Sequence, residues 1–391
     1  MCVCRLIIAI FLLTIPASGF ASDPIADLEL KIRRDEVNLG FEAERGYLAS
    51  LLKTLKVPLS SQTLVFSKTS LQSEHISPKT PRAIYFNDDV YVAWVQGASL
   101  IEIMSVDPKK GSMFYVLRQE RSERPQFEKS TGHECSVCHY VREAAPRFVP
   151  RLLVSSVIPD ATGSVEGTFP IPTTDQSPMN ERWGGWYVTG THGNQKHLGN
   201  TVLKTAASAF AEVPAAAFAR SYDVTDLSSR FDTARYLSPH SDIVALMVLS
   251  HQVEVQNLIA LASANGGTSP KEVGEPLVKT MLFAGAAPLT SPVQGTSNFA
   301  AEFASQGPRD SRARSLRDFD LKSRLLRYPL SYLIYSKPFD EMPAAVKTYV
   351  YSRLREVLTG QDKSAGFAYL SNSDRTAILE ILRETKPDFA R

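Results

Sequence analysis

Short, mostly apolar runs with the composition of β-strands dominate the chain between residues 63 and 119. Each run is rich in β-branched and aromatic residues, and turn-forming residues at 87–89, 96–98 and 108–111 separate several of them. The five runs are 64–66, 83–86, 90–94, 101–104 and 113–117. Their short spacers predict an antiparallel β-meander. Its two faces can meet different surroundings, because successive side chains point to opposite sides.

Helical spacing of apolar residues dominates the two ends of the chain. Residues 23–55 predict two helices that break near Gly40. The segment 242–264 is apolar on nearly every side, which is typical of a buried helix, with Ser241 as its N-cap and Gly266 beyond its end. The C-terminal helices that we expect are 201–210, 242–264, 272–283, 321–335, 344–358 and 373–384.

The N-terminal residues have the pattern of a secretory signal peptide. Arg5 supplies a positive charge, residues 6–15 form an apolar run, and Ala21 offers a small residue for cleavage. The run is shorter than the roughly 20 apolar residues of a membrane span. We therefore expect cleavage near Ala21 and export to the periplasm, with an uncleaved anchor as the less favoured alternative. We expect no membrane span in the rest of the chain.

Composition excludes one class of partner. Hydrophobic residues make up 43% and charged residues 21% of the chain, as in a folded soluble protein. The formal net charge of +2 provides no broad basic field, so we expect no nucleic acid as a partner.

Cysteine usage points to one chemical site. Of four cysteines, Cys2 and Cys4 would leave with the signal peptide, and Cys135, Cys138 and His139 form a C-x-x-C-H motif. In such a motif each thiol adds to a haem vinyl group, and the histidine that follows can bind the iron. A thioredoxin-like dithiol and a structural zinc site are the alternatives. No βαβ pattern supports the first and no second cysteine pair supports the other. The motif predicts one covalent haem c with His139 as the proximal ligand.

The residues offer more than one candidate for the second axial ligand of the iron. His192 and His197 lie in a stretch with two tryptophans and several glycines, and such residues pack closely on a porphyrin. Met179 is a weaker candidate. The alternative for the two histidines is a glycine-rich turn in which they bond to backbone carbonyls. His251, on the buried helix, is expected to be a satisfied core histidine.

Arginines provide two further candidate features. Those near the motif in sequence could pair with haem propionates; they are Arg142, Arg147, Arg151 and Arg182. A cationic run at 309–327 could dock an acidic partner, although a solvated surface with ion pairs is the favoured interpretation.

Several stretches occur together in one family of proteins. They are 70–77, 81–92, the motif at 135–139, 181–193 and 315–322. Through them the chain resembles the exported, single-haem cytochrome c-like proteins of environmental bacteria, which have no assigned activity. The resemblance implies covalent haem through Cys135, Cys138 and His139 and a periplasmic location, and it implies no substrate.

Together these patterns predict an α+β protein. We expect a signal peptide at 1–21, an N-terminal antiparallel β-meander with a loop-rich haem c segment at 22–200, and a mainly α-helical C-terminal region at 201–391. The expected function is single-electron transfer by a periplasmic monohaem cytochrome c with a periplasmic redox partner protein, after assembly by the cytochrome c maturation system. A haem enzyme of peroxidase or oxidase type, or a haem-based gas sensor, is the alternative if the distal site is open.

Overall fold

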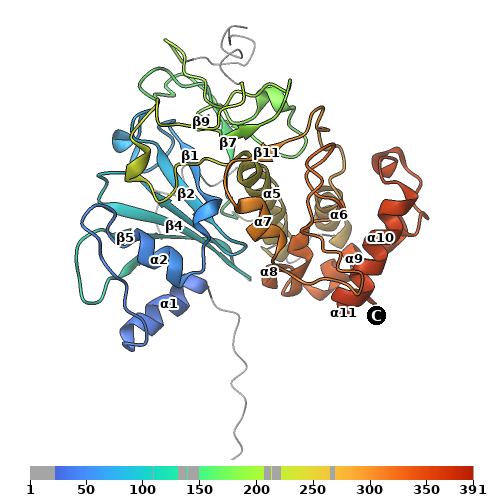
Figure 1. Ribbon diagram of the computed structural model, residues 1–391. Coiled ribbons are helices and arrows are strands. Elements are labelled where there is room, and N and C mark those ends of the chain that lie inside the picture. Colours follow the sequence, from blue (N-terminus) through green and yellow to red (C-terminus); the bar gives the residue numbers. More distant parts are fainter. Residues whose placement is uncertain are drawn as a thin grey trace, which may run out of the picture.

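The computed structural model describes residues 23–108, 110–130, 139, 149–206, 213, 222–264 and 269–390. In these ranges the chain forms a seven-stranded antiparallel sheet with helices on both faces (Figure 1). The prediction of a mixed α+β fold is confirmed. The predicted signal peptide, Cys135 and Cys138 lie outside the described residues.

The sheet runs from β6 at one edge to β9 at the other. Its strands in spatial order are β6 (Phe127–Lys129), β5 (Gly111–Arg118), β4 (Leu100–Asp107), β3 (Val90–Trp94), β2 (Arg82–Phe86), β1 (Thr63–Val65) and β9 (Trp186–Tyr187). Consecutive strands from β1 to β6 are neighbours. The last strand, β9, returns much later in the chain and pairs Tyr187 with Leu64.

Two short helices cover one face of the sheet. They are α1 (Pro24–Arg33) and α2 (Leu48–Thr54), and their apolar residues share a core with alternate side chains of β2 to β5. Asp23 caps α1 by accepting from the N–H of Ile25 at 3.0 Å. Its carboxylate also accepts from the hydroxyls of Ser105 and Tyr115, so it fastens α1 to β4 and β5.

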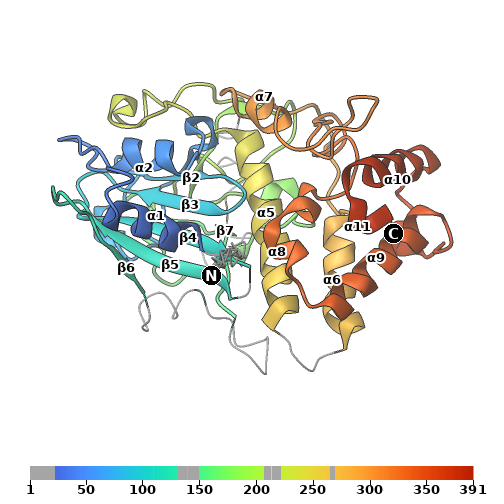
Figure 2. The same ribbon diagram turned by 90° about the horizontal axis from the view of Figure 1, so that it is seen from below.

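The long helix α5 (Ile243–Ala264) packs on the other face and separates the sheet from the C-terminal helices (Figure 2). Those helices include α6 (Pro270–Met281), α9 (Ala344–Leu358) and α10 (Asn372–Thr385). Sheet residues such as Phe86 and helix residues such as Leu354 belong to the same apolar core. By length and composition α5 could cross a membrane, a possibility that the sequence analysis did not assign to this segment. In the structure, however, 83% of its most apolar window is buried, as in the core helix of a soluble protein.

The remaining elements are short. The chain also forms the helices α7 (Phe299–Ala304), α8 (Lys337–Asp340) and α11 (Pro387–Ala390). Two small ribbons pair β7 (Ser155–Ser156) with β8 (Ile171–Pro172), and β10 (Gly190–Thr191) with β11 (Gln294–Gly295). Single 3₁₀ turns are η1 (Leu59–Ser61), η2 (Ser73–His75), η3 (Met179–Glu181), η5 (Thr233–Arg235), η6 (Tyr332–Tyr335) and η7 (Ala365–Phe367).

Two of the helix predictions are wrong over the described residues. Residues 201–206 are not helical, because the N–H of Leu203 bonds to the carbonyl of Pro159, a distant segment; residues 207–210 lie outside the description. Of 321–335 only Tyr332–Tyr335 forms a turn of 3₁₀ helix. Leu321 has a φ of 55°, and the carboxylate of Asp320 accepts from the N–H groups of the next turn. Pro329 also disfavours helical geometry in the residue before it.

Asp242, rather than the predicted Ser241, is the N-cap of α5. Its Oδ1 atom accepts from the N–H groups of Val244 and Ala245 at 2.8 and 3.2 Å. The hydroxyl of Ser241 instead donates to the carbonyl of Tyr187 and accepts from the N–H of Leu64. Ser241 therefore joins the start of the core helix to β1 and β9.

Candidate functional site

His139 is the residue of the C-x-x-C-H motif that the structure describes. Its ring packs against Phe114 of β5, with ring centroids 4.7 Å apart. Its Nδ1 atom lies 2.6 Å from the carbonyl oxygen of Arg151, and the N–H of Arg151 donates to the carbonyl of His139 at 2.8 Å. Because a carbonyl only accepts, Nδ1 carries the proton and the lone pair of the neutral ring is on Nε2. Nε2 has no hydrogen-bond partner within the described ranges.

This donor arrangement fits a haem ligand. Histidines that bind a metal usually donate their other ring N–H to a carbonyl or carboxylate, which fixes the tautomer and the ring orientation. Burial lowers the pKa of His139, and the positive charge of Arg82 acts in the same direction, whereas the bond to Arg151 and the charge of Glu102 oppose them. The lowered pKa favours the neutral imidazole, in which Nε2 presents a lone pair.

A second pair of hydrogen bonds fixes the segment that holds His139. The N–H of Leu152 donates to Oδ1 of Asn257 in α5, and the side-chain amide of Asn257 donates to the carbonyl of Leu152, each at 2.8 Å. The imidazole of His139 is thus bonded to Arg151, and Leu152, the residue after Arg151, is bonded to α5. Rigid support of this kind keeps a ligand in one orientation.

A polar cluster on the same face of the sheet lies within electrostatic reach of His139. Glu102 of β4 accepts from Ser70 at 2.6 Å, from Gln72 at 3.1 Å and from the Nη1 group of Arg82 at 3.2 Å. The Nε–H of Arg82 is buried and has no partner among the residues that the structure describes. Arg82 therefore has an unused donor that suits a carboxylate.

His192 and His197, the predicted distal candidates, lie next to each other. Their ring centroids are 4.6 Å apart and both side chains are buried. Nδ1 of His192 lies 2.7 Å from the carbonyl oxygen of Gln195, and the ring of His197 packs edge-on against Trp183. Burial, with a smaller contribution from His192, lowers the pKa of His197 to about 3.

Among the described residues, no hydrogen bond or ring contact joins this pair to His139. The two histidines follow β9 and β10, whereas Phe114, which His139 contacts, lies on β5. Five strand spacings separate β5 from β9, or roughly 24 Å at about 4.8 Å each. The side chain of Met179 is half-buried against the core of α5. The identity of the distal ligand stays a prediction.

The glycines beside the tryptophans have a structural use. A Cβ atom on Gly184 would lie 2.3 Å from the carbonyl oxygen of Val157, and one on Gly185 would lie 2.8 Å from Ser67. Gly185 also has a φ of 82°, which favours glycine. These residues let the chain approach itself closely around the buried Trp183.

No family model, curated protein or solved structure matches the chain. What can be inferred about function therefore depends on the residues and their geometry.

A constellation that the sequence did not reveal surrounds His251. Its Nδ1 atom lies 2.6 Å from Oδ2 of Asp175 and its Nε2 atom 2.8 Å from the hydroxyl of Ser331. The connectivity is that of a Ser–His–Asp triad. Ser331 is 0% exposed, however, and its hydroxyl caps η6, whereas a nucleophile must reach a substrate. The prediction that His251 is a satisfied core histidine is confirmed.

Of the predicted propionate partners, two are described. The guanidinium of Arg182 is buried and donates to the carbonyls of Ser177 and Asp175, both at 2.8 Å, so it holds a loop together. Arg151 contributes its backbone to His139. Arg142 and Arg147 lie outside the described residues.

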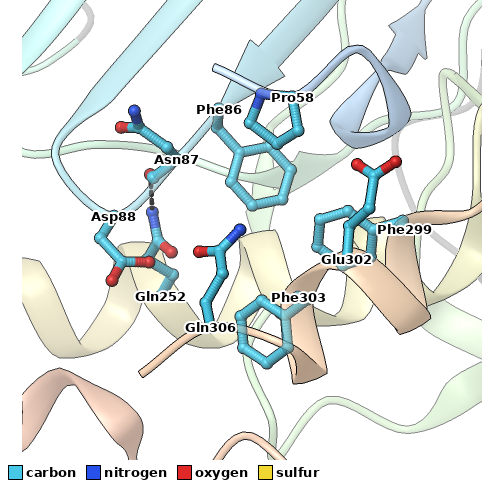
Figure 3. Close-up of a pocket in the computed structure, with 9 residues that line it drawn as sticks. All are labelled: Pro58, Phe86, Asn87, Asp88, Gln252, Phe299, Glu302, Phe303 and Gln306. Atoms are coloured by element: carbon cyan, nitrogen blue, oxygen red, sulfur yellow. Dashed lines mark hydrogen bonds between the residues drawn. The ribbon is translucent and has the colours of Figure 1, made fainter. Parts of the chain in front are cut away.

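Two hollows occur elsewhere on the molecule. One lies where the turn after β2 meets α5 and α7, among Asn87, Asp88, Gln252 and Phe303 (Figure 3). Its volume of about 20 Å³ is enough for roughly one water molecule. The other is an open groove of about 600 Å³ lined by residues of the cationic run and α10.

Ion pairs neutralise much of the cationic run. Arg314 bonds to Asp310 at 2.6 Å, Arg324 to Asp374 at 2.6 Å, and Arg312 to Glu380 at 2.8 Å. Of the two interpretations, the structure supports a solvated surface with ion pairs.

Proposed function

We propose that the protein is an exported monohaem cytochrome c that transfers single electrons. The observation that carries the proposal is the state of His139 within its motif: a supported imidazole whose Nδ1 is bonded to the carbonyl of Arg151 and whose Nε2 is free among the described residues. The sequence supplies the two thiols, Cys135 and Cys138, at the required spacing.

Four residues of the chain have roles in this proposal. Cys135 and Cys138 attach haem c through thioethers, and Nε2 of His139 binds the iron. The haem supplies a centre that gains and loses one electron. Arg82 faces the same side of the sheet and uses its free Nε–H to hold a propionate. The meander of β1 to β6 then carries the loop-rich haem segment, and the helical C-terminal region supports it through α5.

The proposal includes the cellular setting. The signal peptide directs export and is cleaved near Ala21, the cytochrome c maturation system attaches the haem in the periplasm, and a periplasmic redox protein exchanges electrons with it. The protein would then belong among the exported single-haem cytochrome c-like proteins that its sequence resembles.

An open distal site is the alternative, and it would suit a peroxidase-type or oxidase-type enzyme or a gas sensor. Because no contact joins His192 or His197 to His139 among the described residues, the open distal site should be tested. Carbon monoxide distinguishes the two cases. The Soret band of a reduced six-coordinate carrier stays in place, whereas that of an open site shifts promptly at native pH.

The deciding experiment is production of the chain in a host that matures c-type cytochromes. Intact mass should show one added haem, and the reduced protein should show sharp visible bands. The Cys135→Ala/Cys138→Ala variant should lose the covalent haem, and the matched His133→Ala variant, two residues before the motif, should keep it. A bare polypeptide with both thiols free in the parent protein would contradict the proposal.

A further inference from the structure

The register of the sheet brings Arg82 and Glu102 together on one face. Glu102 of β4 is opposite Ala93 of β3, and Ala93 is opposite Ile84 of β2. Arg82 lies two residues before Ile84 and shares its face, because side chains two positions apart on a strand point the same way. Since Ala93 is small, the two long side chains meet across β3, with Nη1 of Arg82 3.2 Å from Oε2 of Glu102.

The same face of the sheet contacts the predicted haem ligand. Val116 of β5 is opposite Glu102. Phe114, two residues before Val116, packs against the ring of His139. The charges of Arg82 and Glu102 both act on the pKa of His139, in opposite directions. The ion pair therefore lies beside the position that the proposed haem would occupy.

Hydrogen bonds hold the carboxylate of Glu102 in one orientation. Its Oε1 atom accepts from the hydroxyl of Ser70 at 2.6 Å and from the side-chain amide of Gln72 at 3.1 Å. Gln72 is anchored in turn, because its side chain forms two hydrogen bonds with the backbone of Leu100, at 3.2 and 3.1 Å. The two donors on Oε1 leave Oε2 to accept from Arg82.

The bond to Glu102 uses one side of the guanidinium of Arg82 and leaves the other side available. Glu102 accepts from Nη1, whereas Nε–H and Nη2 form a second pair of donors in the rigid fork of an arginine. Nε is buried, and neither Nε nor Nη2 has a hydrogen-bond partner among the described residues. The side chain is only 15% exposed, and an unpaired buried donor costs free energy.

We propose that Glu102 is a positioning residue, which holds Arg82 so that its available donors bind a haem propionate and raise the reduction potential of the iron. The inference rests on the proposed haem protein. A propionate fits these donors, because a guanidinium binds a carboxylate through two parallel N–H groups. A fixed positive charge raises the potential, since the ferric centre carries one more positive charge than the ferrous centre and is disfavoured beside a cation.

An ion pair without a positioning role is the alternative. In that case Arg82 and Glu102 would act on the iron only through their own charges. The effects of two fixed charges add, because each interacts with the iron independently. If Glu102 instead holds Arg82 in place, the effect of replacing one residue depends on the presence of the other, as expected for neighbours in one network.

The test measures the midpoint potential of the full haem-loaded chain by redox titration at pH 7. Arg82→Gln should lower the ratio of reduced to oxidised haem at a given potential by about three- to tenfold, as expected for one charge roughly 15 Å away at an effective dielectric constant of about 20. Glu102→Asp keeps the charge but shortens the side chain, so it should lower the ratio by a smaller factor. Arg33→Gln, at an exposed ion pair on α1 at the other face of the sheet, should leave the ratio unchanged.

A double variant separates positioning from charge alone. A shift caused by Glu102→Gln in the parent that differs from its shift in Arg82→Gln supports the proposal. Equal shifts in the two backgrounds, or a parent-like potential in Glu102→Asp, would overturn it. Ser70→Ala keeps both charges and removes one donor to Glu102. It serves where a Glu102 variant fails to fold: its ratio should also fall, and an unchanged ratio would overturn the proposal.

Intact mass, recorded for every protein, separates this inference from the proposed function. A parent chain without covalent haem would contradict the proposed function itself. Haem-loaded parent and variant proteins with additive shifts would contradict only the role of Glu102.

Discussion

Nδ1 of His251 lies 2.6 Å from the carboxylate of Asp175 in the interior of the protein. The ring also stacks on Phe283, with centroids 4.2 Å apart. Its second nitrogen is bonded to Ser331. The contact joins α5 to the loop before η3 and to the start of η6, so three segments that are distant in sequence depend on one imidazole.

Replacement of His251 should therefore destabilise the fold strongly. His251→Leu leaves the carboxylate of Asp175 buried without its partner, and breaking such a pair costs about 3–5 kcal/mol. Ser331→Ala removes one hydroxyl and should cost only about 1 kcal/mol. Urea unfolding followed by circular dichroism measures both. A loss below 1 kcal/mol in His251→Leu would show that the contact is not structural.

Glu254, one helical turn after His251, should make stability depend on pH. Burial raises its pKa to about 7, the charge of Asp175 adds to this, and His251 and Arg182 oppose it. Because the pKa is higher in the folded state, the stabilising contribution is complete below pH 4 and is lost as pH rises towards 7. Relative to Glu254→Gln, the parent should lose up to about 3 kcal/mol over this interval.

The measurement is the free energy of unfolding of both proteins at several pH values between 4 and 8. Glu272→Gln, on the exposed side of α6, controls for the loss of a charge. Parallel curves for the parent and Glu254→Gln would contradict the prediction.

Asp242 should be among the most sensitive positions at the start of α5. One carboxylate oxygen caps the helix, and the other accepts from the N–H and hydroxyl of Ser297 at 2.8 and 2.7 Å. Asp242→Ala should cost about 2–4 kcal/mol, because it removes the cap and leaves these donors unpaired. Asp226→Ala, at an exposed local turn, should change stability by less than about 1 kcal/mol. Equal thermal unfolding of the two variants would contradict this role.

Gly184→Ala should destabilise the turn between the two tryptophans. The new Cβ would lie 2.3 Å from the carbonyl of Val157, a backbone atom that cannot move aside alone. Overpacking of this kind costs about 1–3 kcal/mol. Gly366→Ala, where the nearest atom is 4.0 Å away, should be neutral or slightly stabilising. Thermal unfolding of both variants shows whether close packing is the reason that residue 184 is a glycine.

Local patterns were enough to place most of the regular structure. The five β-rich runs coincide with β1 to β5, because β-branched and aromatic residues and turn residues such as Asn87 are visible within a few positions. The long apolar stretch likewise became α5. The helix expected at 321–335 failed because its apolar spacing competes with the turn that Asp320 stabilises.

Contacts between residues that are far apart in the sequence could not be predicted from the sequence. Asp175, His251 and Ser331 are far apart in the chain, and no local pattern announces that they meet. The Gly- and Trp-rich context did single out His192 and His197, but it could not show that their rings lie next to each other. The C-x-x-C-H motif at 135–139 could be recognised because all its residues are neighbours in the sequence.

The pairing of β9 with β1 has a consequence for the order of assembly. Residue 129 ends β6 at one edge of the sheet, and residue 186 begins β9 at the opposite edge. Strands β2 to β5 pair with neighbours that lie close in sequence, whereas Leu64 of β1 must find Tyr187 across a long stretch of chain. Because such a pairing must first overcome the entropy of closing a long loop, we expect the hairpins of β2 to β5 to form early and the edge that β9 completes to form last.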